Sequence, residues 1–422
     1  MTLSHTQSQA HLQAHLQELL LDLLSTNRIV APEAIARLGT QDWGFVLERV
    51  KQHRLGPLLH WRLTRERGAL PIPADISAQL AESFKMATLR ALLMQRELLL
   101  THRILARAGI PHAALKGAYL AYHAYPHPAL RPLRDLDLLV PSDQALPAYQ
   151  ALIEGGLARW EKYPGNPEAC SELNHHLPPL RAPSGQFSVE LHNRISHLEP
   201  GHECEQQADP AEDPLFWQRF IQRDLGGDSI SFLSATDLAL HLIVHAFFDH
   251  QLNNGPLIFS DLAYLLASHE IDWPLFWILA EERGQSRACV LMLRLVERYF
   301  GSQAVDWPEM PGVPDWVLEQ AALATLADSD ARRDVAVHGG TLGRASLPEK
   351  IAYLLYRALP PRKRIETMYP VSGNRVYFGY VMNWWRLATR RIPEYLRSRQ
   401  DGELVDESRR MSRLQQWVRE PG

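Results

Sequence analysis

Two aspartates separated by a single residue, at the start of an apolar run, restrict most strongly what this chain can fold into. They stand in LRDLDLLVP at residues 133–141. In a strand, residues i and i+2 face the same side, so Asp135 and Asp137 are expected to project together. Neighbouring carboxylates repel each other, and the pair is tolerated mainly when a cation lies between them. The run therefore predicts a strand with a divalent-cation site, with a solvated sheet face as the alternative.

A third acid follows the same logic. Glu190 lies in FSVELHN, the second strand of a predicted hairpin closed by residues 183–186. Beside the first strand it would complete a set of three acids, which we predict as ligands of Mg²⁺, or of Mn²⁺ in its place. Glu190 is also the expected base. His175, His176 and His192 flank the hairpin, and His192 shares the strand face of Glu190. We predict that His192 contacts a phosphate or the acceptor, with a structural, hydrogen-bonded histidine as the alternative.

Positive charge precedes the acidic strand. Lys116 and Gly117 end a short strand before a predicted helix, where backbone amides could hold phosphate oxygens and glycine permits close approach. Arg131 and Arg134 follow, directly before Asp135. We predict these residues as the triphosphate-binding group, with Lys116 and Arg131 favoured over Arg134.

Hydrophobic spacing divides the chain into four parts. Residues 1–109 read as helices, the last of them over residues 76–108 and stopped by Gly109 and Pro111. Residues 110–225 alternate short apolar stretches with turns and are the predicted α/β core. Residues 226–335 are predicted as a helical domain that caps this core and opens at a Ser234 cap. Residues 336–422 are a predicted helical tail, which gives an α+β fold with helical regions on both sides of the core.

These motifs carry a family resemblance. The lysine-glycine pair followed by RPLRDLDLLV, HHLPPL and VELHNRI resembles the bacterial family of uncharacterised nucleotidyltransferases, within the polymerase-β-like superfamily, over about residues 40–270. The resemblance implies a mixed-sheet nucleotidyltransferase-fold core, Mg²⁺ dependence and transfer of a nucleoside monophosphate from an NTP to a hydroxyl-bearing acceptor, with release of pyrophosphate. It also implies that Asp135, Asp137 and Glu190 bind the metal.

One position departs from the superfamily pattern. Gly117 is followed by Ala118, where a serine or a second glycine is usual, and the interval to Asp135 is long. This departure keeps a second hypothesis open, a regulatory module that binds nucleotide without turnover. A third hypothesis is a metal-dependent hydrolase that uses His241, His245 and Asp261, since histidines at i and i+4 share a helix face. That stretch, HLIVH, lacks the glutamate of the HExxH motif, and a bracing role for His245 and Asp261 is preferred.

Bulk properties limit the partners. A net charge of −4 and a pI near 6.6 give no sign of a protein built to hold nucleic acid. Three cysteines without CxxC spacing suit a reducing compartment, and no apolar run is long enough to cross a membrane, so we expect a cytoplasmic protein. The aromatic and basic stretch around Trp384 and Trp385 is expected to dock on the rest of the protein, with contact to a membrane surface as the alternative.

Overall fold

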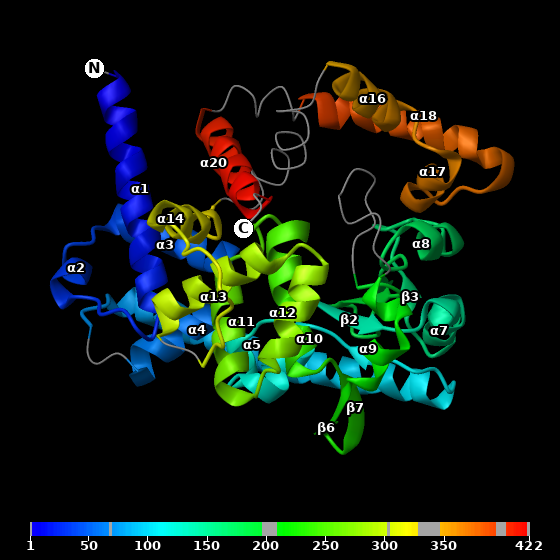
Figure 1. Cartoon of the computed structure of the whole chain (residues 1–422), viewed down its shortest axis with the longest axis horizontal. Coiled ribbons are helices and arrows are strands. Elements are labelled where there is room, and N and C mark those ends of the chain that lie inside the picture. Colours follow the sequence, from blue (N-terminus) through cyan, green and yellow to red (C-terminus); the bar gives the residue numbers. More distant parts are fainter. Residues whose placement is uncertain are drawn as a thin grey trace.

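A mixed seven-stranded sheet forms the centre of the computed structural model, which describes residues 2–66, 70–195, 209–301, 304–327, 347–393 and 402–419 (Figure 1). The strand order is β3-β4-β5-β2-β1-β7-β6. The expected α+β fold, with a mixed sheet between helical regions, is confirmed. The strands are β1 (Ala113–Ala114), β2 (Asp135–Leu139), β3 (Ala158–Arg159), β4 (Leu180–Arg181), β5 (Ser188–His192), β6 (Ile221–Leu225) and β7 (Asp228–Phe232).

The two central strands run parallel and set the register of the acidic residues. Asp137 of β2 lies beside Glu190 of β5, and Leu139 lies beside His192. The predicted hairpin is present, since β4 pairs with β5 in antiparallel fashion across the turn at residues 182–187. Parallel strands need a long crossover, which is provided here by α7 (Ala145–Glu154) and α8 (Pro167–Leu173).

The sheet extends beyond the boundary expected at residue 225. Strands β6 and β7 form a hairpin whose turn residues Gly226 and Gly227 both have positive φ, the conformation that a tight two-residue turn requires. Strand β7 then pairs with β1 in parallel, with Phe232 beside Ala114. The boundary expected between residues 225 and 226 falls between the two strands of this hairpin, because the long-range pairing of β7 with β1 is not visible in local spacing.

A helical region precedes the sheet. It contains α1 (Thr2–Leu24), α2 (Pro32–Ala36), α3 (Thr40–Gln52), α4 (Gly56–Trp61), a π-helical turn (Arg62–Glu66) and α5 (Ala74–Arg107). Helix α5 matches the predicted long helix and stops before Gly109, which has a φ of 70°. Its Arg90 lies over the ring of Phe187, the residue directly before β5, and its Glu97 accepts a hydrogen bond from the Ser184 amide. Helix α5 thus packs against the turn that leads into β5.

A second helical layer follows the sheet. It consists of α10 (Ala235–Val244), a π-helical turn (His245–Asp249), α11 (Leu257–Ser268), α12 (Trp273–Glu282), α13 (Ser286–Phe300) and α14 (Asp315–Ala324). Ser234 caps α10 as predicted, since its hydroxyl accepts a hydrogen bond from the Asp237 amide. Nine of the ten residues of α10 are buried, so this apolar helix is the centre of the layer and packs on α11, α12 and α13.

The C-terminal part forms two separate groups of helices. In the first group, α17 (Arg362–Met368) packs on α8 and on α18 (Val376–Arg386), and α16 (Leu347–Ala358) lies beside α18 (Figure 1). In the second, α20 (Gly402–Arg419) packs on α13 and α14. The expected boundary at residues 335 and 336 lies outside the described residues. Among the described helices, none combines the length and the apolar character needed to span a bilayer.

A buried ion pair joins the sheet region to the second helical layer. Arg131 Nε lies 2.6 Å from Asp261 Oδ1 of α11, and the Tyr125 hydroxyl donates a hydrogen bond of 2.7 Å to the same oxygen. Asp261 is 2% exposed, so its charge needs these partners. This contact between the two regions agrees with the bracing role expected for Asp261. His245 instead lies 3.0 Å from Asp249 of its own helical turn.

Removing the carboxylate should destabilise the protein strongly. Asp261→Ala leaves the Arg131 guanidinium buried without its counter-charge, and we expect a loss of about 3 kcal/mol in the free energy of unfolding. Tyr125→Phe removes one hydrogen bond and should cost about 1 kcal/mol. Urea unfolding of both variants measures these differences. Equal unfolding midpoints for Asp261→Ala and wild type would contradict the bracing role.

Candidate active site

Four polar side chains lie on one face of the sheet, over its two central strands. Asp135 and Asp137 share a face of β2 because they are two residues apart, and the parallel register places Glu190 directly beside Asp137. His192 follows two residues after Glu190, on the same face of β5. The structure therefore brings together all three predicted acids and the predicted histidine.

Three of these side chains form a group that could hold a metal ion. Ligand atoms of Asp137, Glu190 and His192 all lie within 4.8 Å of one another, and in the described part of the chain no other group of three His, Cys, Asp or Glu side chains meets this criterion. His192 Nε2 lies 3.4 Å from Asp137 Oδ1 and 4.0 Å from Glu190 Oε2. Carboxylate oxygens suit Mg²⁺ and Mn²⁺. The group has His192 where the sequence predicted Asp135, whose role as a ligand stays a prediction.

Crowding of buried carboxyls disturbs their ionisation. Burial, followed by the charges of Asp137 and Asp135, raises the pKa of Glu190 to about 8. Burial and the charge of Asp137 raise the pKa of Asp135 to about 6. Burial opposes ionisation of Asp137 too, but Lys116 and His192 outweigh it and hold the pKa of Asp137 well below its usual range. The site therefore favours one carboxylate charge and resists the others, as expected where a cation is needed.

Lys116 supplies the compensating charge within the chain. Its Nζ lies 3.2 Å from Asp137 Oδ2. Burial would lower the pKa of Lys116, but Asp137 and Asp135 raise it, so the ammonium stays charged. The backbone of Lys116 has a φ of 48°, which is unfavourable for a residue with a side chain and is typical of functional sites. Lys116 was predicted to hold phosphate, and in this structure it pairs with the carboxylate of Asp137.

The turn after Lys116 is closely packed. A Cβ on Gly117 would lie 2.4 Å from Leu133 Cδ2 and 3.7 Å from the guanidinium carbon of Arg131. This close approach explains the need for glycine here. The helix that follows is short, with α6 (Gly117–Tyr119) running into a π-helical turn (Leu120–Ala124). The predicted helix after Gly117 is present.

The two predicted arginines differ in what they contact. Arg131 lies next to Gly117, but its Nε is bound by Asp261. Arg134 is exposed and forms no ion pair with any described residue, although its charge favours ionisation of Asp135. The order of preference given by the sequence is therefore not supported by these contacts, since Arg134 is the arginine with an uncommitted charge.

Further histidines surround the acidic group. His176 Nε2 lies 4.0 Å from Glu190 Oε2, and His176 pairs with His192 through a backbone bridge. Burial, followed by the charge of His192, lowers the pKa of His176 to about 4. The His175 ring lies 5.2 Å from the His192 ring. The sequence placed both residues beside the hairpin but could not indicate this contact with Glu190, which depends on the loop before β4.

The hydrolase hypothesis finds no support in the positions of its three residues. Asp261 is bound by Arg131 and Tyr125, and His245 is bound by Asp249 and His250. His241 is buried, and its Nε2 has no hydrogen-bond partner among the described residues. Burial, then the charges of Lys116 and His192, lower the pKa of His241, which places this neutral ring close to the acidic site.

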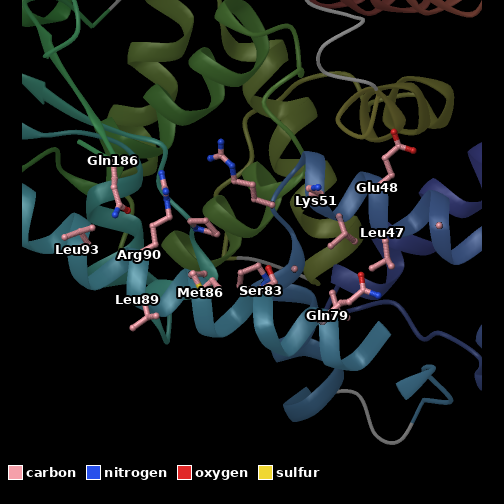
Figure 2. A pocket seen from close by; sticks show the side chains of 18 residues that line it. Leu47, Glu48, Lys51, Gln79, Ser83, Met86, Leu89, Arg90, Leu93 and Gln186 are labelled. Carbon is pink, nitrogen blue, oxygen red and sulfur yellow. The ribbon is translucent and has the colours of Figure 1, made fainter. Parts of the chain in front are cut away.

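A groove of about 960 Å³ opens between α3, α4 and α5 (Figure 2). Pro132 and Gln186 line the groove and belong to the segments that lead into β2 and β5. The groove therefore lies near the N-terminal ends of these two strands. Its wall is largely apolar, with three cations and one acid, and none of these cations forms an ion pair with a described residue. The charged residues are Lys51, Arg54, Arg90 and Glu48.

The chain thus has a mixed sheet with paired carboxylates on one face, between two helical regions. A family described as uncharacterised nucleotidyltransferases matches residues 39–301. Because the match covers more than half of the chain, the protein belongs to this family. No curated protein and no solved structure matches it.

Neutralising Glu190 should stabilise the metal-free protein at alkaline pH. The pKa of Glu190 is about 8 in the folded state, against about 4.3 for an unfolded glutamate. Its contribution to stability is therefore complete below pH 4.3 and is lost as the pH rises through 8. In EDTA at pH 9, we expect the free energy of unfolding of Glu190→Gln to be about 2 kcal/mol higher than that of wild type. This value is reduced because Glu190 and Asp135 titrate together.

Urea unfolding between pH 5.5 and 9 measures this difference. Glu154→Gln, which changes an exposed glutamate of α7, is the matched control and should follow the wild-type curve. A Glu190→Gln curve that also follows wild type would mean that the carboxyl of Glu190 is not held in a crowded, water-poor site.

Proposed function

We propose that the chain transfers a nucleoside monophosphate from an NTP to a hydroxyl-bearing acceptor and releases pyrophosphate. The observation that supports this proposal best is the grouping of Asp137, Glu190 and His192, with Asp135 beside them, on one sheet face of a nucleotidyltransferase-family chain. In the reaction, the acceptor oxygen bonds to the α-phosphorus while the bond from this phosphorus to the bridging oxygen of pyrophosphate breaks.

Each residue of the site has a proposed role in this reaction. Asp135, Asp137 and Glu190, with His192, would hold Mg²⁺ or Mn²⁺, which supplies positive charge to the phosphates and the leaving group. Glu190, which a bound cation would keep ionised, is the proposed base that takes the acceptor proton. Lys116 balances Asp137 before substrate binds, and its ammonium would offer positive charge to a bound phosphate. Arg134 adds an exposed positive charge before Asp135.

The groove beside the site is the proposed place for the acceptor. Pro132 lies three residues before Asp135, and Gln186 lies four before Glu190, so extended chain would span on the order of 10 Å from groove to carboxylates. The apolar wall of the groove and its excess of positive charge favour an acceptor with an apolar body and an anionic group.

Calorimetric titration with each NTP tests this function. We expect nonhydrolysable α,β-linked analogues to bind in the presence of Mg²⁺, and Asp135→Asn/Asp137→Asn to weaken that binding at least tenfold, because the cation that bridges protein and phosphates is lost. Asp143→Asn/Asp224→Asn, which changes two exposed acids away from the site, should bind like wild type.

Two results would contradict the proposal in different ways. Folded wild type that binds no NTP would exclude nucleotide chemistry at this site. Mg²⁺-dependent binding of NTPs without release of pyrophosphate in the presence of any of a panel of hydroxyl acceptors would favour the non-catalytic module instead, in line with the alanine at position 118.

A further inference from the structure

Exposed apolar side chains gather on the helices α16 to α18. Of the twenty large hydrophobic side chains exposed in the described residues, ten lie within residues 347–393. Tyr377 is 73% exposed, Trp385 70% and Phe378 64%. Patches of this kind mark interaction surfaces. The ten residues are Ile351, Leu354, Leu355, Leu359, Tyr377, Phe378, Val381, Trp384, Trp385 and Ile392.

The exposed residues follow helical spacing. On α18 they occur at positions 377, 378, 381, 384 and 385, and on α16 at 351, 354 and 355, followed by Leu359 just beyond it. Spacings of three and four residues place them in one stripe on each helix. The other side of α18 is used inside the protein, where Val376 packs with Ile365, Tyr369 and Val371 in a small core of its own. The two helices are thus amphipathic, with an exposed apolar stripe on each.

Charge in this segment is opposite to that of the whole chain. Residues 347–393 hold nine Lys or Arg and two Glu, a formal charge of +7 in a chain whose net charge is −4. Lys363 and Arg364 contact Glu172 and Asn174 and dock the segment on α8. Arg375 and Arg390, at either end of α18, are exposed. Trp, Tyr and Arg beside aliphatic residues are the combination found where proteins meet the headgroup region of a bilayer.

We propose that α16, α17 and α18 form a unit that binds the surface of a membrane containing anionic lipids. The unit would lie in the interface, with the stripes of α16 and α18 among the headgroups and the arginines facing lipid phosphates. A second copy that met the same unit face to face fits less well, because it would bring one strongly positive surface against another. The docking that the sequence favoured for the stretch around Trp384 and Trp385 is found in part, since Trp384 Nε1 donates a hydrogen bond to the Ala358 carbonyl, whereas Trp385 is exposed. This proposal does not depend on the proposed nucleotidyl transfer.

Cosedimentation with vesicles tests the proposal on the full chain. Wild type should bind vesicles of 70% phosphatidylcholine and 30% phosphatidylglycerol at least tenfold more tightly than vesicles of phosphatidylcholine alone, and salt should weaken that binding. Phe378→Glu/Trp385→Glu should reduce the affinity for anionic vesicles at least tenfold, because it places acids in the apolar stripe. Neither side chain belongs to the small core of the unit.

Ile29→Glu/Leu215→Glu is the matched control, since it makes the same chemical change at two exposed residues outside the unit and should bind like wild type. Thermal unfolding of each variant verifies that it is folded. Folded wild type that binds neither kind of vesicle would overturn the proposal. So would a dimer in solution that Phe378→Glu/Trp385→Glu dissociates without any vesicle binding by wild type, since the stripe would then serve association between copies of this chain.

Discussion

Repulsion among buried carboxyls is the constraint on which the rest of the site depends. Asp135, Asp137 and Glu190 occupy adjacent positions on two paired strands, where the register leaves them no freedom to separate. Among the lysine and arginine side chains of the described residues, only Lys116 forms an ion pair with any of them. The result is one ionised carboxylate and two carboxyls of raised pKa. Such an arrangement costs stability and becomes favourable when a divalent cation joins the group.

The surrounding structure holds this unfavourable group in place. Lys116 has a strained backbone, Gly117 packs against Leu133, and Arg131 beside it is fixed by the carboxylate of Asp261. Asp261 belongs to α11, so the second helical layer takes part in shaping the turn from which Lys116 projects. A strained residue persists only where its neighbours over-determine its conformation. The layer after the sheet is therefore part of the site's framework, although it contributes no ligand to the group of Asp137, Glu190 and His192.

Local patterns predicted much of this site, and long-range contacts account for what they missed. The alternation around Asp135 and Asp137 predicted their common face, and the hairpin before Glu190 predicted its strand. The contact of His176 with Glu190 and the bond between Arg131 and Asp261 could not be predicted, because each joins segments whose separation in sequence carries no information about distance in space. The sheet continues past the expected boundary for the same reason, since the pairing of Ala114 with Phe232 spans more than a hundred residues.

Helix α8 links the acidic site to the surface proposed to meet the membrane. Its Glu172 and the following Asn174 bind Lys363 and Arg364 of α17, and His176, two residues after Asn174, approaches Glu190. The positive charge lies in the docked helices, while the remainder of the chain is negative. An anionic surface would attract the positively charged helices and repel the negatively charged remainder, and this difference would orient the bound protein. Taken together, the two proposals place nucleotidyl transfer beside a lipid surface, where an acceptor with an apolar body and an anionic group would itself be concentrated.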